Sequence, residues 1–121
     1  MPREDQHQQK AERNEEFAAS LDTANPTHEN WAVVASFYAA LHYVQTYFAR
    51  KGIEAASHDE RFEQIKRDVK LRHALVSYKY LYTLSRTARY YCTGLPASAY
   101  TKEAKPNLAA VKTQVQHALR N

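Results

Sequence analysis

Hydrophobic side chains are concentrated in the first half of the chain, where residues 31–49 include no Asp, Glu, Lys or Arg. At helical spacing, one apolar face consists of Trp31, Val34, Tyr38, Leu41 and Phe48, and another of Val33, Phe37, Ala40, Val44 and Tyr47. A helix that is apolar on most sides is buried on most sides. We therefore predict a helix over about residues 28–51, with Thr27 as its N-cap and Gly52 ending it. It forms either the centre of a bundle or one face of a homodimer.

The rest of the chain has narrower hydrophobic stripes. Residues 3–21 are good helix formers with few apolar positions, which predicts a helix attached along a thin stripe. Ser57 and Glu60 have the spacing of a capping box, which predicts a helix over about residues 58–69. Two more helices are expected over about residues 71–92 and 105–120, separated by the breaker sequence 93–96. The expected inward positions are Ala11, Phe17, Ala18 and Leu21; Phe62, Ile65 and Val69; Leu71, Leu75, Tyr78, Tyr82, Ser85 and Ala88; and Leu108, Val111, Val115 and Leu119.

These segments predict an all-α protein, a four- to five-helix up-and-down bundle that is one domain overall. Residues 1–24 would form its charged N-terminal helix and residues 25–121 the remaining bundle. The chain of 121 residues has only two Gly and four Pro, too few for the many turns of an all-β fold. Its single cysteine, Cys92, allows no intrachain disulfide. The N-terminus is charged and no apolar run reaches about 18 residues, so we expect no signal peptide, no spanning helix and a cytoplasmic location.

The charge is distributed unevenly along the chain. Residues 1–30 carry three basic and seven acidic side chains, a net of −4, whereas residues 31–121 carry fourteen basic and six acidic, a net of +8. A basic body favours a phosphate-rich partner, and the acidic N-terminal helix could cover it. The alternative is a small domain with a high isoelectric point that binds no nucleic acid.

Two groups of histidines and arginines are candidates for a site. His42 lies in the apolar helix, where an imidazole needs a partner or stays neutral, so it either lines a cleft or is a hydrogen-bonded core residue. His58 and Arg61 are three positions apart at a helix start, where backbone N–H groups suit a phosphate. The alternative for this second pair is a histidine that only follows the cap and an arginine that is solvated.

The long fourth segment carries the strongest basic pattern. Arg72, Lys79 and Arg86 are spaced by seven positions, which puts three cations along one helical face, and Arg89 lies one turn beyond. Aromatic rings among cations suit unpaired bases, and Tyr80, Tyr90 and Tyr91 lie nearby. The stripe is either an RNA-binding face or the solvated side of the helix. Arg89 lies toward the apolar side, so a structural or catalytic role is expected for it.

Other chemistries have little support in the sequence. Cys92 has no patterned histidine partner, so a thiol nucleophile is not expected. The six histidines are scattered and the acidic residues form no ligand set, so we expect no metal site and no cofactor. A glycine-rich phosphate loop is also missing from the sequence.

Two motifs resemble the HEPN-domain family. The segment from Trp31 to Tyr43, with the later Gly52 and the pair Ser57-His58, resembles the long second helix of that family and the Ser/Thr-His pair that follows it. The sequence Ser85-Arg86-Thr87-Ala88-Arg89-Tyr90 resembles the Ser-x-x-Ala-Arg-Tyr motif that closes the family's fourth helix region. The resemblance covers about residues 28–92, with compatible helices on both sides.

This resemblance implies a helical bundle that dimerises and acts on RNA. Many HEPN proteins are metal-independent ribonucleases of toxin–antitoxin and phage-defence systems, in which an Arg and a His from two subunits form a composite cleft. Their usual motif is Arg, four to six residues, then His. In this chain Arg67 and His73 have that spacing, but they fall across the expected kink before the long helix. Other HEPN domains bind RNA or nucleotides, or assemble with proteins, without cutting.

The leading prediction is an RNA-directed HEPN-like homodimer of a toxin–antitoxin or phage-defence system, with metal-independent ribonuclease activity left open, and the alternative is a non-catalytic protein-interaction or nucleotide/RNA-binding module. In an enzyme, His58 would be the acid or base, Arg61 and Arg89 would hold the phosphate, and His42 would line or support the cleft. The expected nucleic-acid contacts are Arg72, Lys79, Arg86 and Tyr90. Expected partners are RNA or a nucleotide, a second copy of the chain, and an antitoxin or larger effector protein; no membrane is expected.

Overall fold

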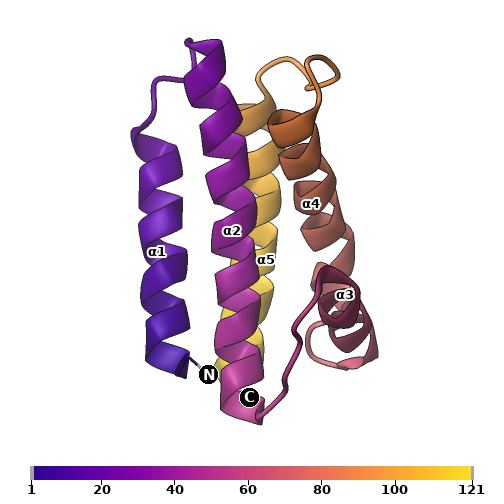
Figure 1. Ribbon diagram of the computed structural model, residues 1–121. Coiled ribbons are helices and arrows are strands. Elements are labelled where there is room, and N and C mark those ends of the chain that lie inside the picture. Colours follow the sequence, from indigo (N-terminus) through magenta and orange to yellow (C-terminus); the bar gives the residue numbers. More distant parts are fainter. Residues whose placement is uncertain (1, 121) are drawn as a thin grey trace.

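Five α-helices packed against one another make up the computed structural model, which describes residues 2–120 and contains no β-strand within them. The helices are α1 (Glu4–Ser20), α2 (Pro26–Lys51), α3 (His58–Arg67), α4 (Leu75–Tyr90) and α5 (Lys105–Arg120). A short 3-10 turn, η1 (Arg72–Ala74), precedes α4, and a π-helical segment, η2 (Ala99–Ala104), leads into α5. The four long helices lie side by side, and the short α3 lies beside the beginning of α4 (Figure 1). The all-α prediction is confirmed.

Helix α2 is the centre of the molecule, as its apolar composition predicts. It packs against α1, α4 and α5, and its largest fully buried side chains are Phe37, Tyr43, Tyr47 and Phe48. Trp31, which belongs to one of the two expected apolar faces, is 55% exposed in the single chain. Trp31 lies in the second turn of α2, so the end of the helix that carries it is not covered on all sides.

The ends of α2 depend on two residues with special backbone roles. Thr27 is not the N-cap: the Asn25 side chain accepts hydrogen bonds from the backbone N–H groups of Thr27 and His28, and Pro26 is the first helical residue. Proline suits that position because its missing N–H would have no helical partner there. At the other end Gly52 adopts a left-handed conformation with φ of 69°, as expected for a glycine that ends a helix.

Helix α1 is held to α2 by small residues. Ala11 and Ala18 are fully buried, whereas Phe17 is 50% exposed, which corrects its predicted inward position. On the same face of α1, the Glu15 carboxylate accepts hydrogen bonds from the Tyr43 hydroxyl and the Lys112 ammonium, so it joins α1 to both α2 and α5. Burial, followed by this bond, raises the pKa of Tyr43. The predicted N-terminal helix is therefore packed into the bundle.

The connection between α3 and α4 contains a true break, which the sequence pattern placed two residues too late. The Asp68 carboxylate accepts the N–H groups of Lys70 and Leu71 and also the hydroxyl of Tyr47 on α2. These bonds end α3 at Arg67 and tie the turn to the central helix. Val69 is consequently in the turn and 71% exposed, so its predicted inward position is wrong.

Two other helix boundaries also differ from the predictions. Ser57 accepts the N–H of Glu60 as expected of the cap, but the Glu60 carboxylate accepts the N–H of Ala56 and not that of Ser57. Helix α4 ends at Tyr90, two residues earlier than predicted. The π-helical segment before α5 was not predicted, and its Ala99, Tyr100 and Ala104 are buried.

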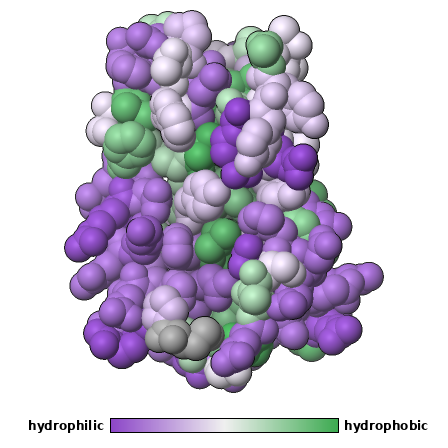
Figure 2. Space-filling model, viewed as in Figure 1, coloured by the Kyte–Doolittle hydropathy of each residue, from purple (hydrophilic) through white to green (hydrophobic). Residues whose placement is uncertain are grey.

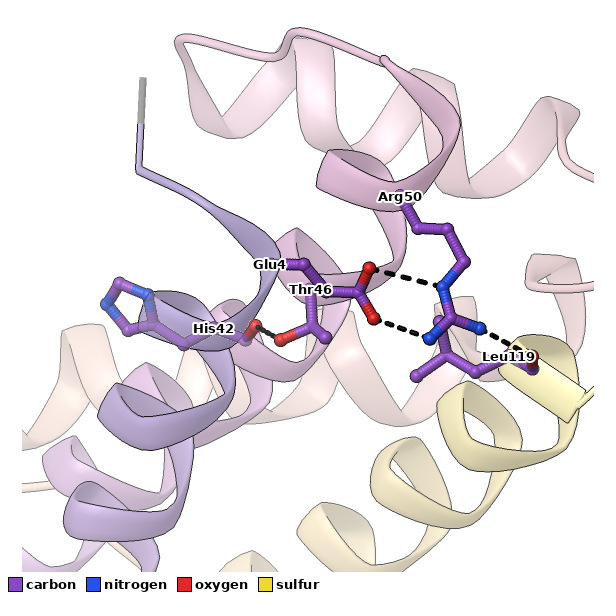
Figure 3. Close-up of polar contacts among 5 residues, drawn as sticks. All are labelled: Glu4, His42, Thr46, Arg50 and Leu119. Carbon is purple, nitrogen blue, oxygen red and sulfur yellow. Dashed lines mark hydrogen bonds and ion pairs between the residues drawn. The ribbon is translucent and has the colours of Figure 1, made fainter.

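At the end of the bundle where α2 terminates, Arg50 joins three helices. Its guanidinium binds both carboxylate oxygens of Glu4 on α1, and its Nη1 donates to the backbone oxygen of Leu119 on α5 at 2.7 Å (Figure 3). Both charged side chains are partly exposed, so we expect the pair to contribute about 1 kcal/mol or less. Its structural effect is to keep the N-terminal and C-terminal helices in register with α2.

The outer surface of the bundle is largely polar. Figure 2 shows one face mostly covered by hydrophilic residues, with hydrophobic residues visible in smaller patches between them. Among residues 2–120, none of the helices has the length and apolar character needed to cross a lipid bilayer.

Candidate functional site

The predicted residues His58, Arg61, Arg86 and Arg89 gather where α3 and the second half of α4 face α2. The ring of Tyr82 on α4 lies at the centre of this region, with its centroid 4.7 Å from that of His58 and 5.6 Å from that of Phe37. Phe37 is fully buried in α2 and supports both rings from below. Packing of three helices thus brings together side chains that are far apart in the sequence, such as Phe37 and Tyr82, which are 45 positions apart.

Arg61 determines the chemical state of His58. One guanidinium nitrogen, Nη2, lies 3.0 Å from Nδ1 of His58, and another, Nη1, donates to the backbone oxygen of Ala55 at 3.3 Å. Because arginine can only donate, Nδ1 must accept, and a neutral His58 carries its proton on Nε2. Burial and then the positive charges of Arg61 and Arg89 lower the pKa of His58, and the weaker effect of Asp59 opposes them.

Arg89 is held by tyrosines and backbone. Its Nη1 donates to the hydroxyl of Tyr38 on α2 at 3.2 Å and lies 3.5 Å from that of Tyr90, while its Nε donates to the backbone oxygen of Ser85. The guanidinium carbon also lies 5.0 Å from the centroid of the Tyr90 ring and 5.8 Å from that of Tyr38, within cation–π range. These contacts fix Arg89 at the rim of the core without using a negative charge.

Arg86 extends the same arrangement outward. Its Nη1 donates to the Tyr82 hydroxyl at 3.2 Å, and its guanidinium lies 5.8 Å from the Tyr82 ring and 5.9 Å from the Tyr90 ring. Tyr90 is therefore shared by two arginines and remains 64% exposed. We call Arg61, Arg86 and Arg89, with Tyr38, Tyr82 and Tyr90, the arginine–tyrosine face.

The positive charge of the arginine–tyrosine face is not neutralised within the described part of the chain. The ion pairs of residues 2–120 involve Arg3, Arg50, Arg67 and Lys112, and none involves Arg61, Arg86 or Arg89. Three cations therefore lie close to one histidine, and their hydrogen-bond partners are that histidine, tyrosine hydroxyls and backbone oxygens. Such a concentration of uncompensated charge favours an anionic ligand.

The opposite side of α3 is acidic, which does not favour the expected phosphate binding at its N-terminus. The first turn contains Asp59 and Glu60, and the side chains of Ser57 and Glu60 already accept the N–H groups of Glu60 and Ala56. These carboxylates, with Glu54 and Glu63, line a shallow hollow of about 410 Å³. Arg86 and Arg89 lie on the α4 side of His58, away from these carboxylates.

The remaining predicted cations are less well placed. Lys79 lies over the ring of Phe62, with Nζ 5.2 Å from its centroid, and it is on the exposed side of α4. Arg72 lies in η1, before α4 begins, so the spacing of seven no longer determines its direction relative to Lys79. The predicted stripe of three cations on one continuous helical face is therefore interrupted at Arg72.

His42 is not part of the arginine–tyrosine face. Its ring turns toward α1, where Nδ1 lies 3.0 Å from Nδ1 of His7 and the two rings stack with centroids 5.3 Å apart. Burial lowers the pKa of His42 to about 4, with smaller effects from His7, Lys10 and Arg61. The structure thus supports the alternative that His42 is a hydrogen-bonded, neutral residue of the helix interface.

Several residues of this region have no signal in the sequence. His7 and Tyr38 lie 35 and 51 positions from the side chains they bind, so local spacing could not identify them. Beneath the face, the Tyr78 hydroxyl, the Ser85 hydroxyl and Nε of Arg61 are buried without a hydrogen-bond partner among the described residues. Burial raises the pKa of Tyr78 to about 12, so its phenol stays protonated at neutral pH.

Two further features bear on what the site can bind. Among residues 2–120 there is no group of three or more His, Cys, Asp or Glu side chains arranged to hold a metal ion. A wide hollow of about 780 Å³ lies at the other end of the bundle, beside Arg3 and Arg50, but their charges are paired with Asp5 and Glu4. That hollow is also lined by Arg120, but two carboxylates, those of Glu4 and Asp5, line it as well.

Comparisons with protein-family models, with curated proteins and with solved structures found no match to this chain. The HEPN-like identity therefore stays a prediction from the two sequence motifs.

Proposed function

We propose that this protein binds single-stranded RNA through the arginine–tyrosine face, as an HEPN-like module. The observation that carries the proposal is the cluster of three arginines, Arg61, Arg86 and Arg89, which have aromatic and backbone partners but no carboxylate among the described residues. A phosphodiester backbone supplies the missing negative charge. In such a complex Arg86 and Arg89 contact phosphates.

The tyrosines favour an unpaired strand over a duplex. Tyr90 and Tyr91 are 64% and 60% exposed at the end of α4, next to Arg86 and Arg89. Exposed aromatic rings stack on bases only where the bases are free of a partner strand. Arg86 and Arg89 both contact the Tyr90 ring, which restricts its motion and so reduces the entropy lost when a base stacks on it.

The geometry favours binding over cleavage. A general base needs a free lone pair on nitrogen, but Arg61 occupies Nδ1 of His58, so Nε2 carries the proton. A general acid needs an imidazolium, and the charges of Arg61 and Arg89 oppose its formation. In this arrangement His58 is suited to donate a hydrogen bond from Nε2 to a phosphate oxygen.

Metal-independent RNA cleavage is the second candidate, because one histidine lies among three arginines. It would require Arg61 to move away from Nδ1 when RNA binds, so that His58 can exchange a proton with the 2′-hydroxyl or the leaving oxygen. The biological setting that accompanies either candidate is a cytoplasmic toxin–antitoxin or phage-defence system, with a homodimer and an antitoxin or effector protein as partners.

The binding proposal is tested by fluorescence anisotropy with a labelled single-stranded RNA of about 16 nucleotides or more, the upper site size of a small binding domain. We expect Arg86→Gln and Arg89→Gln each to weaken binding about fivefold or more and to reduce the salt slope by about 0.7 for each phosphate that is no longer neutralised. Arg67→Gln is the matched control, because Arg67 is paired with Glu63 on α3. No RNA binding by the wild type at low salt, or an equally large weakening in the control, would overturn the proposal.

Cleavage is tested on the same RNA with EDTA present. We expect intact RNA with the wild type, His58→Ala and Arg67→Gln. Cutting by the wild type and by Arg67→Gln that His58→Ala abolishes, with circular dichroism unchanged, would instead establish the ribonuclease and assign His58 to catalysis.

A further inference from the structure

A small pocket lies between the beginning of α2 and the end of α4, beside the arginine–tyrosine face. It has a volume of about 190 Å³ and is lined by Thr27, Asn30, Trp31, Val34, Ala88 and Arg89. Arg89 belongs both to this pocket and to the arginine–tyrosine face, so a ligand in the pocket would be continuous with a strand bound along α4.

The lining combines the groups that a planar polar ring needs. Val34 and Ala88 supply apolar contacts, and Trp31 keeps 55% of its surface exposed although it belongs to the most apolar helix. The Asn30 side chain makes no hydrogen bond with another described residue. Its amide NH₂ group therefore remains available to donate and its amide oxygen to accept. The Arg89 guanidinium provides positive charge at the edge.

We propose that this pocket holds one unpaired purine base of the RNA, with adenine preferred. The inference rests on the proposed RNA binding and adds a base-reading site to it. The pocket is smaller than a site for a drug-sized ligand, which has a volume of about 300 Å³ or more, so it suits a single ring system. The sugar and phosphate would remain outside the pocket, near Arg89.

Adenine fits the Asn30 amide, while the Arg89 guanidinium already donates to Tyr38 and to the backbone oxygen of Ser85. The amide of Asn30 offers an oxygen acceptor and an NH₂ donor side by side, which matches the N6 amino group and N7 of adenine. Guanine presents two acceptors, O6 and N7, at the same edge, and would leave the amide oxygen unpaired. The Trp31 indole contributes stacking, which is stronger for the larger purine rings than for pyrimidines.

Trp31 makes the proposal directly measurable, because it is the only tryptophan of the chain. A base that stacks on its indole should quench the intrinsic fluorescence. We would titrate the full chain with adenosine 5′-monophosphate and with oligomers of A, G, C and U, and measure anisotropy on the same oligomers. The expected result is saturable quenching by the A-oligomer, with at least about fivefold tighter binding than the U-oligomer.

Two variants separate the pocket from the rest of the RNA-binding surface. Asn30→Ala removes the polar contact and should abolish the preference for A, whereas Ala88→Leu fills the pocket and should abolish quenching. Asn14→Ala, on α1, is the matched control because Asn14 binds only the backbone of its own helix. Circular dichroism and urea unfolding confirm that each variant is folded.

The outcomes for the pocket and for the proposed function are distinguishable. RNA binding that depends on Arg86, without quenching or without loss of base preference in Asn30→Ala, would overturn the pocket and leave the RNA-binding proposal standing. Saturable quenching by adenosine 5′-monophosphate that Ala88→Leu abolishes, without any binding of oligomers, would keep the base site and overturn RNA binding.

Discussion

His7 on α1 and His42 on α2 face each other through the same ring nitrogen, with Nδ1 atoms 3.0 Å apart. One Nδ1 must carry a proton and the other must accept it, so the contact requires at least one neutral ring. Lys10 on α1 and Arg61 on α3 add positive charge near His42, and Glu54 lines the hollow beside His7. Burial lowers the pKa of both histidines, and that of His42 to about 4.

This pair predicts a loss of stability in mild acid. The unfolded His42 binds a proton below its ordinary pKa of 6.5, whereas the folded residue resists protonation until about pH 4. The contribution of neutral His42 to the free energy of unfolding is therefore fully present above pH 6.5. It decreases as the pH drops from 6.5 toward 4. Because the ring is partly exposed, we expect a loss of about 1–2 kcal/mol, measured as the free energy of urea unfolding across this range.

A matched pair of variants assigns the effect. His42→Gln should reduce the acid dependence, leaving the part that comes from the lowered pKa values of His7 and His58, and His28→Gln, which changes an exposed histidine at the start of α2, should leave it as in the wild type. Equal pH dependence in wild type and His42→Gln would contradict this role of the histidine pair.

Removal of residues 1–24 tests whether the acidic N-terminal helix masks the RNA-binding surface. The structure places α1 on the side of α2 opposite α4 (Figure 1), with Ala11 and Ala18 fully buried. We expect the truncated chain to lose its cooperative urea transition, because the interface of α2 with α1 becomes exposed. A folded truncated protein with raised RNA affinity would show instead that α1 acts as a cover.

Asp68 is expected to contribute more to stability than any exposed carboxylate of α3. Asp68→Ala removes the carboxylate that accepts from the N–H groups of Lys70 and Leu71 and from the Tyr47 hydroxyl, although the Leu71 N–H keeps its bond to the backbone oxygen of residue 68, and we expect a cost of about 1–3 kcal/mol. Asp59→Ala, at an exposed position of the same helix, should change stability by about 0.5 kcal/mol or less. The free energy of urea unfolding is measured for both variants. Similar losses in Asp68→Ala and Asp59→Ala would contradict the special role of Asp68.

Gly52 should be sensitive to substitution for a backbone reason alone. Its φ is 69°, and an added Cβ would meet no atom within 4 Å, so side-chain crowding does not enter. Gly52→Ala should cost about 1 kcal/mol, and Gly52→Asn less, because asparagine tolerates the left-handed conformation better. Thermal unfolding that ranks alanine as the more stable variant would contradict this explanation.

The sequence by itself determined the helical class and the position of the central helix. Apolar residues recur along α2, α4 and α5 with a local period, and period depends only on near neighbours in the chain. The apolar pattern predicted helix ends wrongly where side-chain hydrogen bonds to the backbone end or begin a helix. Asn25 rather than Thr27 caps α2, and the Asp68 turn removes Val69 from α3.

Part of the candidate site could also be predicted, because His58, Arg61, Arg86 and Arg89 lie on helix faces that the spacing defines. The partners of Arg89 and His42 could not be predicted from the sequence. Tyr38 is 51 positions from Arg89, and His7 is 35 positions from His42. Only the packing of α1 and α4 on opposite sides of α2 decides that His42 binds His7 and that Arg89 faces tyrosines. Helix formation is a local property, whereas the meeting of distant polar side chains depends on how whole helices pack.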